Sequence, residues 1–324
     1  MTGFIINRLL QAVVVMLAMS AIVFVGVYAI GNPIDVLISP EAPQKVRAEI
    51  IAHYGLDQPL WRQYLVFLGN LLSGDLGRSF LYGVPVLPLI LSRAPATIEL
   101  AGAAILGATL IGIPLGLYAG YRPRSWLSRA IMGLSVLGFS VPTFWIGLIL
   151  ILTFAVDLQW LPAGGRGPTM PVGGVEWSLF SATGWAHLLL PALTLSLFRL
   201  ALMIRLTRAG MREAILSDYV KFARAQGLPE RRVIGGHVFK NISIPLVTVF
   251  GLELGQTVAF AVVTETIFSW PGMGKLIIDS ITALDRPVMV GYLILITFLF
   301  IVINLIVDLV YALLDPRLRR GGAT

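Results

Sequence analysis

Six long apolar runs, separated by shorter polar stretches, follow one another along the chain. Each run has about twenty residues, the length that an α-helix needs to cross the hydrocarbon of a bilayer. A transmembrane strand would instead alternate apolar and polar residues over about ten positions, so the pattern predicts helices. The predicted spans are Leu9–Ile30, Leu100–Ala119, Ala130–Val156, Leu188–Leu206, Ile242–Ile267 and Val288–Leu314. The predicted fold is an all-α polytopic membrane protein with six transmembrane helices.

Composition agrees with this fold class. Of 324 residues, 57% are hydrophobic and 13% are charged, whereas soluble domains have about 25% charged residues. The chain has no cysteine, which excludes disulfides and thiolate metal sites. The net charge of +7 is better explained by basic cytoplasmic loops than by nucleic-acid binding, because no basic run is interleaved with stacking aromatic residues.

The distribution of Lys and Arg predicts the orientation. With the N-terminus inside, the cytoplasmic segments hold Arg8, Arg122, Arg124, Arg129, the basic residues between 205 and 240, and those of the C-terminal tail. The short external loops then hold only Arg166, Lys275 and Arg286. Positive charge favours the cytoplasmic side, so we expect both termini in the cytoplasm. We expect the first span to be retained, because it is longer than the 7–15 apolar residues of a signal peptide.

Polar segments divide the chain further. The expected parts are the N-terminus and first span (1–30), an extracytoplasmic segment between the first two helices (31–98), a five-helix core (99–314) and a cytoplasmic tail (315–324). Within the extracytoplasmic segment, Trp61, Tyr64, Leu65, Leu68 and Leu72 recur at helical spacing. This spacing predicts an amphipathic helix at the outer interface of the membrane.

The loop between the fourth and fifth helices (207–241) is the longest predicted cytoplasmic loop. Asp218 suits a helix N-cap, Gly227 suits the C′ position after a helix, and Pro229 suits the first turn of the next one. The prediction is a helix–turn–helix whose bend at Gly227 lets another surface approach closely. Two interpretations stay open at this point: a solvated loop that carries orientation charge, or a docking surface for a cytoplasmic partner.

Three charged residues interrupt the last three spans: Arg199, Glu253 and Asp308. At a rise of 1.5 Å per residue, each lies roughly 10–14 Å from the cytoplasmic boundary. A lone charge in hydrocarbon costs at least about 2.5–3.5 kcal/mol and usually finds a partner. Our hypothesis is that Arg199 pairs with Glu253 or Asp308 as a structural clamp. The functional alternative places one or more of the three on a translocation path.

Four polar residues are further candidates for such a path: Ser140, Gln256, Thr257 and Asn304. Each could equally form a hydrogen bond between helices.

No pattern of catalytic residues is present. The stretch SWPGMGKL has Ser269 in place of the first glycine of a P-loop and Leu276 in place of its Ser or Thr, so it predicts a turn and not a phosphate site. The three histidines are far apart and lack metal-ligand spacing. We therefore expect no catalytic residue, metal or cofactor in this chain.

Several motifs in order along the chain carry a family resemblance. They are GLDQPLWRQY, GDLGRSF, PATIEL, FSVPTFWIG, LPAGG, DYVKFARAQGLPERRVIGGHVFKNISIPLVT, ETIFSWPGMGKL and DPRLR. The chain resembles the inner-membrane permeases of peptide-type ABC importers, the dipeptide, oligopeptide, nickel and glutathione group, and within it the first, or B-type, permease. The resemblance covers nearly the whole chain.

In that family, the cytoplasmic loop resembles a coupling helix that docks on ATPase subunits. The implied docking residues are Ala223, Arg224, Gly227, Leu228, Pro229, Glu230 and Arg231. Gly227 and Ala223 match the family pattern, but Lys221 stands where the pattern has an acidic residue and Phe222 where it has an alanine. The chain therefore lacks the acidic residue that the family pattern has at this position.

The resemblance implies an importer subunit in the bacterial inner membrane. Its expected partners are a second homologous permease, two cytoplasmic ATPases that bind ATP and magnesium, an extracytoplasmic substrate-binding protein and membrane lipid, with no nucleic acid. Dipeptides or oligopeptides are the implied solutes, and nickel chelates, glutathione and some sugars are also open. One alternative is an ion-coupled secondary transporter that uses Glu253, Asp308 and Arg199, for which inverted repeats would be evidence. Another alternative is a membrane scaffold.

Overall fold

The computed structural model describes residues 2–29, 43–45 and 57–314. The predicted tail (315–324) and much of the predicted extracytoplasmic segment lie outside these residues. Contacts divide the chain into two compact units. One comprises Met1–Ser92 and Leu276–Ile301, and the other comprises Arg93–Lys275 and Val302–Thr324.

Five helices are long and apolar enough to cross a membrane. They are α1 (Thr2–Ala29), α5 (Val86–Tyr121), α8 (Ala182–Ala214), α11 (Phe239–Ile267) and α13 (Arg286–Leu314). A bent pair of helices brings the number of candidate spans to six. The structure therefore confirms the all-α polytopic fold class. It also shows that α5 begins at Val86, well before the predicted Leu100.

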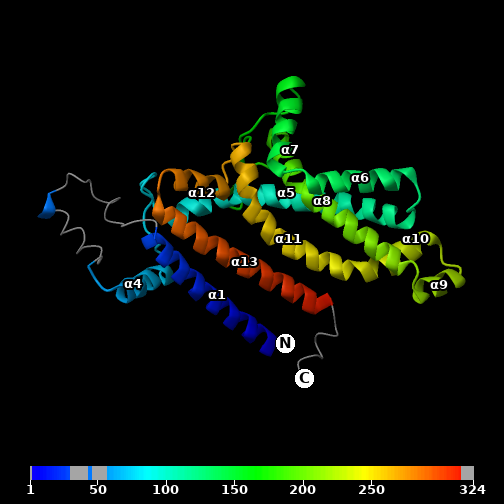
Figure 1. Ribbon diagram of the computed structural model, residues 1–324, viewed down its shortest axis with the longest axis horizontal. Helices are drawn as coiled ribbons and strands as arrows, with labels where there is room; N and C mark the ends of the chain where they lie inside the picture. The colour runs from blue at the N-terminus through cyan, green and yellow to red at the C-terminus, as the bar shows by residue number, and fades with distance from the viewer. Residues whose placement is uncertain (1, 30–42, 46–56, 315–324) are drawn as a thin grey trace. The chain divides into compact units, whose positions relative to one another are not determined.

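The third predicted span is not one continuous helix. Helix α6 (Trp126–Ser140) meets α7 (Thr143–Leu150) at a bend of 107°, and α7 continues as the π-helix η1 (Ile151–Asp157). Figure 1 shows α7 turning sharply away from α6. The cause lies in Val141 and Pro142: proline lacks an N–H and disfavours helical backbone at the preceding residue. Val141 is accordingly extended, with φ −92° and ψ 132°.

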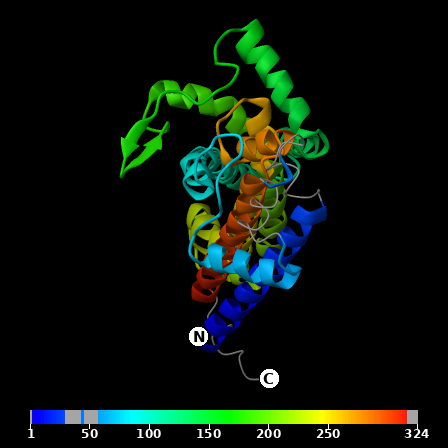
Figure 2. The ribbon, with the colours of Figure 1, turned by 90° about the vertical axis from the view of Figure 1, so that its left-hand side faces the viewer.

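In the first unit, α4 (Leu60–Leu72) packs against α1, and Figure 2 shows the two helices side by side. The Tyr64 hydroxyl lies 2.9 Å from the Ser20 hydroxyl, and its ring packs against Phe24. Trp61 and Leu72 stay exposed. The predicted amphipathic helix is therefore present, with part of its apolar face against α1 and the rest unburied.

In the second unit, α8 packs against α6, α7 and α11. Glycines permit a close contact between α5 and α8. A Cβ added at Gly116 would lie 2.6 Å from Thr207 Cβ. A Cβ added at Gly112 would lie 2.8 Å from Met203 Cβ, and one added at Gly120 would lie 2.6 Å from Met211 Cβ. Small residues at every fourth position let the two helix backbones approach closely, as is common in membranes.

Two short strands interrupt the helical fold. Strands β1 (Met170–Val172) and β2 (Val175–Trp177) pair in an antiparallel hairpin, which Figure 2 shows as paired arrows. The turn residues Gly173 and Gly174 have φ values of +63° and +78°, which suits glycine in a two-residue hairpin turn. Farther along, α12 (Met273–Thr282) precedes α13.

Candidate functional site

The segment between α8 and α11 contains a glycine turn. Helix α9 (Asp218–Ala225) is followed by α10 (Glu230–Arg232), which continues as the π-helix η2 (Val233–Val238) into α11. Gly227 has φ +74°, and Leu228 N–H donates to the Ala223 carbonyl at 3.3 Å. Together with the bond from Gly227 N–H to the Arg224 carbonyl, 2.9 Å long, this is a Schellman motif. The predicted C′ role of Gly227 is confirmed.

Two details of this segment differ from the sequence prediction. Ser217, not Asp218, is the N-cap residue of α9, and no side chain caps this end. The second helix of the predicted helix–turn–helix has only one turn of regular α-helix before the π-helix begins. Pro229 occupies the N-cap position of that turn rather than its first residue.

One side of the α9 segment is anchored in a hydrophobic core. Val220 and Ala223 are buried there with Met211, Val233 and Val238. The partly buried Leu228, directly after the glycine turn, packs against the same core. The turn is therefore held in a defined position relative to α8 and α11.

The other side of the segment is exposed and combines aromatic and charged residues. Phe222 is 65% exposed, and Tyr219, one turn earlier, is 38% exposed. The Arg224 side chain reaches across the turn to Glu230 at 2.6 Å. Lys221 pairs with Asp218 at 2.8 Å, and this hydrogen bond lowers the pKa of the Asp218 carboxyl. Pro229 and Arg231 are also exposed.

Arg199 is buried between α8 and α11. Its Nε lies 3.6 Å from a Glu253 carboxylate oxygen, an ion-pair distance longer than a hydrogen bond. The same Nε donates to the Thr257 hydroxyl, which in turn donates to the Glu253 carbonyl at 2.6 Å. Arg199 also donates to the Leu195 carbonyl at 3.0 Å. The structure thus places Arg199 beside Glu253, one of the two partners in our hypothesis.

The other predicted intramembrane residues differ in their surroundings. Asp308 is half-buried on α13. Gln256 and Asn304 are exposed. Ser140 lies at the end of α6 and donates to the Val136 carbonyl at 2.9 Å. Thr257 is fully buried, and its hydroxyl joins α8 to α11. Among the described residues, no group of three or more His, Asp or Glu could hold a metal ion.

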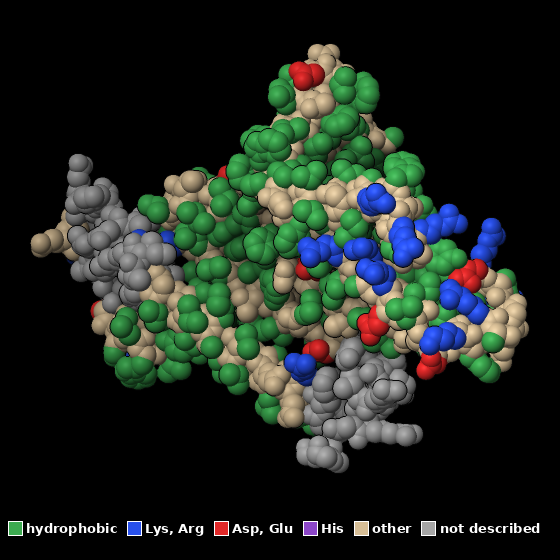
Figure 3. Space-filling view, turned by 45° about the vertical axis from the view of Figure 1, so that its right-hand side comes forward, with side chains coloured by type: hydrophobic (Ala, Val, Ile, Leu, Met, Phe, Trp, Pro, Cys, Tyr) green, Lys and Arg blue, Asp and Glu red, His purple; other side chains and the backbone are tan. Residues whose placement is uncertain are grey.

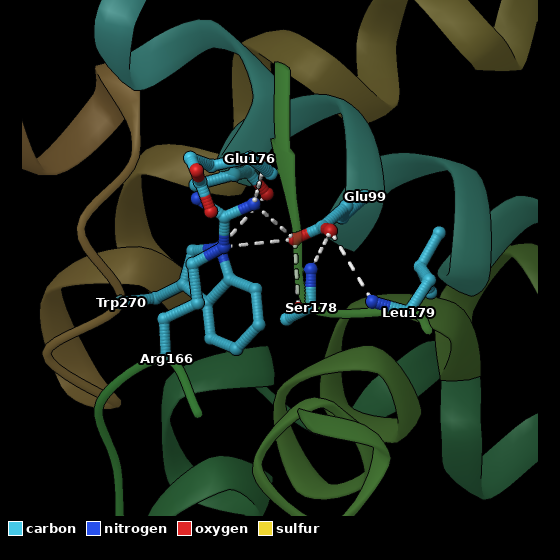
Figure 4. Close-up of polar contacts among 7 residues, drawn as sticks. Glu99, Arg166, Glu176, Ser178, Leu179 and Trp270 are labelled. Carbon is cyan, nitrogen blue, oxygen red and sulfur yellow. Dashed lines mark hydrogen bonds and ion pairs between the residues drawn. The ribbon is translucent and has the colours of Figure 1, made fainter. Parts of the chain in front are cut away.

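A buried ionic cluster around Glu99 was missed by the sequence analysis. The Glu99 side chain is fully buried, and its carboxylate pairs with Arg166 at 2.8 Å and accepts hydrogen bonds from the hydroxyl and backbone N–H of Ser178. Figure 4 shows Glu99 on α5 pointing toward Ser178 and Leu179. Arg166 also donates to the Glu176 carbonyl at 2.7 Å. The cluster holds the β1–β2 hairpin and its flanking loop on α5.

A second buried carboxylate, Glu265, holds the start of α12. It accepts a hydrogen bond from the Thr97 hydroxyl at 2.6 Å and one from Lys275 N–H at 2.9 Å. A Cβ at Gly272 would lie 2.3 Å from this carboxylate, so the glycine is required for the contact. Both carboxylates lie in motifs named above: Glu99 in PATIEL and Glu265 in ETIFSWPGMGKL. The sequence signal that could have indicated them is a charged residue at the edge of an apolar run.

The fold is that of a helical, multi-span membrane protein. It is similar to a chain in an inward-facing structure of the MetNI methionine ABC transporter, with a TM-score of 0.56 and 16% sequence identity, covering 71% of this chain and 97% of that chain. Residues 112–320 match the family "Binding-protein-dependent transport system inner membrane component", and residues 1–101 match the N-terminal family of the same membrane components. The chain belongs to this family.

Curated relatives match almost from end to end. The dipeptide transport system permease protein DppB of Escherichia coli (strain K12) is 36% identical over an alignment of 340 positions, which covers 98% of this chain and 99% of the relative. The oligopeptide transport system permease protein AppB of Bacillus subtilis (strain 168) is 37% identical with the same coverage. The di/tripeptide transport system permease protein DppB of Pseudomonas aeruginosa (strain UCBPP-PA14) is 40% identical over 302 residues, with 89% of this chain and 90% of the relative covered.

Proposed function

We propose that this chain is a permease subunit of an ABC importer that moves dipeptides or oligopeptides across the bacterial inner membrane. The observation that carries the proposal is the end-to-end similarity to permeases of dipeptide and oligopeptide transport systems. Family membership favours this function over an ion-coupled secondary transporter or a scaffold. The partners are a second permease, two ATPases and a substrate-binding protein. Both termini lie in the cytoplasm, as the distribution of Lys and Arg favours.

The α9–turn–α10 segment is the surface that docks on an ATPase. Its supporting features are a rigid glycine turn, a buried side that joins it to α8 and α11, and an exposed side with Phe222 and Tyr219. Exposed aromatic residues are frequent energetic centres of protein interfaces. We assign the contact to these aromatic residues together with Arg224, Gly227, Pro229, Glu230 and Arg231.

In the proposed mechanism, closure of the ATPase dimer on ATP pushes this segment. Because Val220 and Ala223 are packed among residues of α8 and the start of α11, the movement passes to the spans and switches access between the two sides of the membrane. ATP and magnesium are bound by the ATPases, and this chain performs no catalytic step. The exposed Gln256 and Asn304, with Ser140 at the α6–α7 bend, are candidates for the solute path.

The test is to isolate the tagged chain gently from its native membrane and identify what co-purifies by mass spectrometry. The natural chain should retain a second permease and P-loop ATPases. With Phe222→Ala, the amount of co-purifying ATPase should fall at least tenfold, because the substitution removes an exposed aromatic anchor. Phe180→Ala is the matched control: Phe180 is 59% exposed and lies outside the docking segment. A chain that purifies without ATPases and still transports peptide would overturn the proposal.

A further inference from the structure

A groove with arginine side chains along one wall lies between α6 and α8. Its volume is about 520 Å³. The lining residues are Met132 and Phe139 of α6, and Leu202, Arg205, Leu206, Arg208, Ala209 and Arg212 of α8. The three arginines recur at spacings of three and four, so they share one face of α8. Figure 3 shows Lys and Arg side chains gathered among hydrophobic ones over the region of α6 and α8–α10.

The arginines of this groove are not neutralised within the described part of the chain. No Asp or Glu is among the described residues that line the groove. Arg208 Nε is buried and has no hydrogen-bond partner among the described residues. Arg205 lies over the Phe139 ring, 5.5 Å from its centroid, and this contact leaves its guanidinium N–H donors available. A buried guanidinium donor without a partner is costly, so the groove is complementary to an anion.

The position along α8 indicates which anion fits. The predicted span ends at Leu206, and α8 continues to Ala214. At 1.5 Å per residue, Arg205 to Arg212 extend from the hydrocarbon boundary to roughly 9 Å beyond it. Lipid headgroups occupy a layer about 5–7.5 Å deep on each side of the hydrocarbon. Arg208, roughly 3 Å beyond the boundary, therefore lies within this layer, and Arg212 lies at its outer edge. The apolar residues Leu202 and Phe139 lie toward the hydrocarbon, where an acyl chain would pack.

We propose that this groove binds an anionic phospholipid, with the phosphate on Arg208 and Arg212 and an acyl chain along Phe139 and Leu202. In the orientation proposed above, the groove opens to the cytoplasmic leaflet, whose anionic lipids attract basic residues at the membrane surface. Bound lipid would support α8 directly before the α9 segment. This inference concerns lipid binding and does not depend on which solute the protein carries.

The experiment uses the full chain with its co-purifying partners in mixed micelles. Phosphatidylglycerol and phosphatidylcholine are supplied in equal amounts, and native mass spectrometry counts the retained lipids. The natural chain should retain phosphatidylglycerol in preference. The double variant Arg208→Gln/Arg212→Gln should bind it roughly 30-fold more weakly, at about 1 kcal/mol for each arginine. Arg212→Gln alone, at an exposed position, should weaken binding about fivefold without disturbing the packing.

The matched control is Arg122→Gln/Arg124→Gln, which removes the same charge from exposed residues outside the groove. It should retain phosphatidylglycerol like the natural chain. Equal loss in the control and in the groove variant would show general surface attraction and overturn the proposal. Displacement of the lipid by dialanine would assign the groove to the solute and also overturn it. So would equal retention of the two lipids by the natural chain.

Discussion

Arg166 and Glu99 form an ion pair of 2.8 Å that joins the loop before β1 to α5. The Arg166 side chain is only 10% exposed and the Glu99 side chain is fully buried. The same carboxylate accepts two hydrogen bonds from Ser178, directly after β2. One buried charge on a long helix therefore holds both ends of the hairpin.

Glu99→Gln should destabilise the protein strongly, because it leaves the Arg166 guanidinium buried without its counter-charge. Removing one partner of a buried ion pair costs about 3–5 kcal/mol. Thermal unfolding in detergent measures the loss, and limited proteolysis should show earlier cleavage in the loop around residues 158–181.

Glu176→Gln is the matched control for this prediction. Glu176 is exposed, and it contacts Arg166 only through its backbone carbonyl among the interactions described. Its substitution should change stability by less than about 0.5 kcal/mol, as is usual for surface positions. Equal midpoints for the two variants would show that the Glu99 ion pair does not hold the hairpin.

Gly116→Ala should weaken the contact between α5 and α8. The new Cβ would lie 2.6 Å from Thr207 Cβ and 2.7 Å from the Ile204 carbonyl oxygen. Both neighbours belong to a helix and cannot easily move away, and overpacking of this kind costs about 1–3 kcal/mol. Gly107→Ala on the same helix meets nothing within 4 Å and should leave stability unchanged or slightly higher. The unfolding midpoints of the two variants check this, and a Gly116→Ala midpoint at or above that of Gly107→Ala would contradict it.

The helical membrane fold could be predicted from the sequence because each span exceeds what a water-soluble helix tolerates in apolar length. The Gly227 turn was also predictable, since a glycine followed by Pro229 is a local signal. The bend at Val141 was not predicted, although Pro142 carries the signal, because the run from 130 to 156 contains no charged residue that would interrupt a span. The clusters of Glu99 and Glu265 depend on residues far apart in the sequence, and no local pattern indicates such partners.

Gly227→Ala should disturb the turn of the proposed ATPase-docking segment without unfolding the protein. At φ +74° the left-handed backbone conformation costs a residue with a Cβ roughly 1–2 kcal/mol of conformational free energy. Gly235→Ala, at a position where φ is not positive and nothing lies within 4 Å, is the control and should be neutral.

The measurement is ATPase activity of the reconstituted complex with and without peptide. We expect Gly227→Ala to lower the peptide-stimulated activity severalfold and Gly227→Asn to lower it less, because Asn tolerates this backbone better than Ala. Similar activity in the Gly227→Ala and Gly235→Ala proteins would contradict a role for the turn.

The Arg199–Glu253 pair allows a test that separates a structural clamp from a residue of the solute path. Arg199→Met alone leaves the Glu253 carboxylate buried, and Glu253→Met alone leaves the guanidinium buried, so each should cost about 3–5 kcal/mol. The double variant removes both charges and replaces them with apolar side chains of similar length. For a clamp, its stability should lie within about 1 kcal/mol of the natural protein, and peptide uptake into proteoliposomes should be retained.

If the double variant is less stable than both single variants, the broken ion pair is not the reason why the single variants lose stability. A double variant that is fully stable but fails to transport would contradict the clamp and place the charges on the path. Gln256→Met is the matched control for a polar residue of α11, because Gln256 is exposed and lies one residue before Thr257. Gln256→Met should leave stability unchanged. If it abolishes peptide uptake while the Arg199→Met/Glu253→Met protein still transports, the solute path lies on the exposed face of α11. Arg199 and Glu253 are then structural residues.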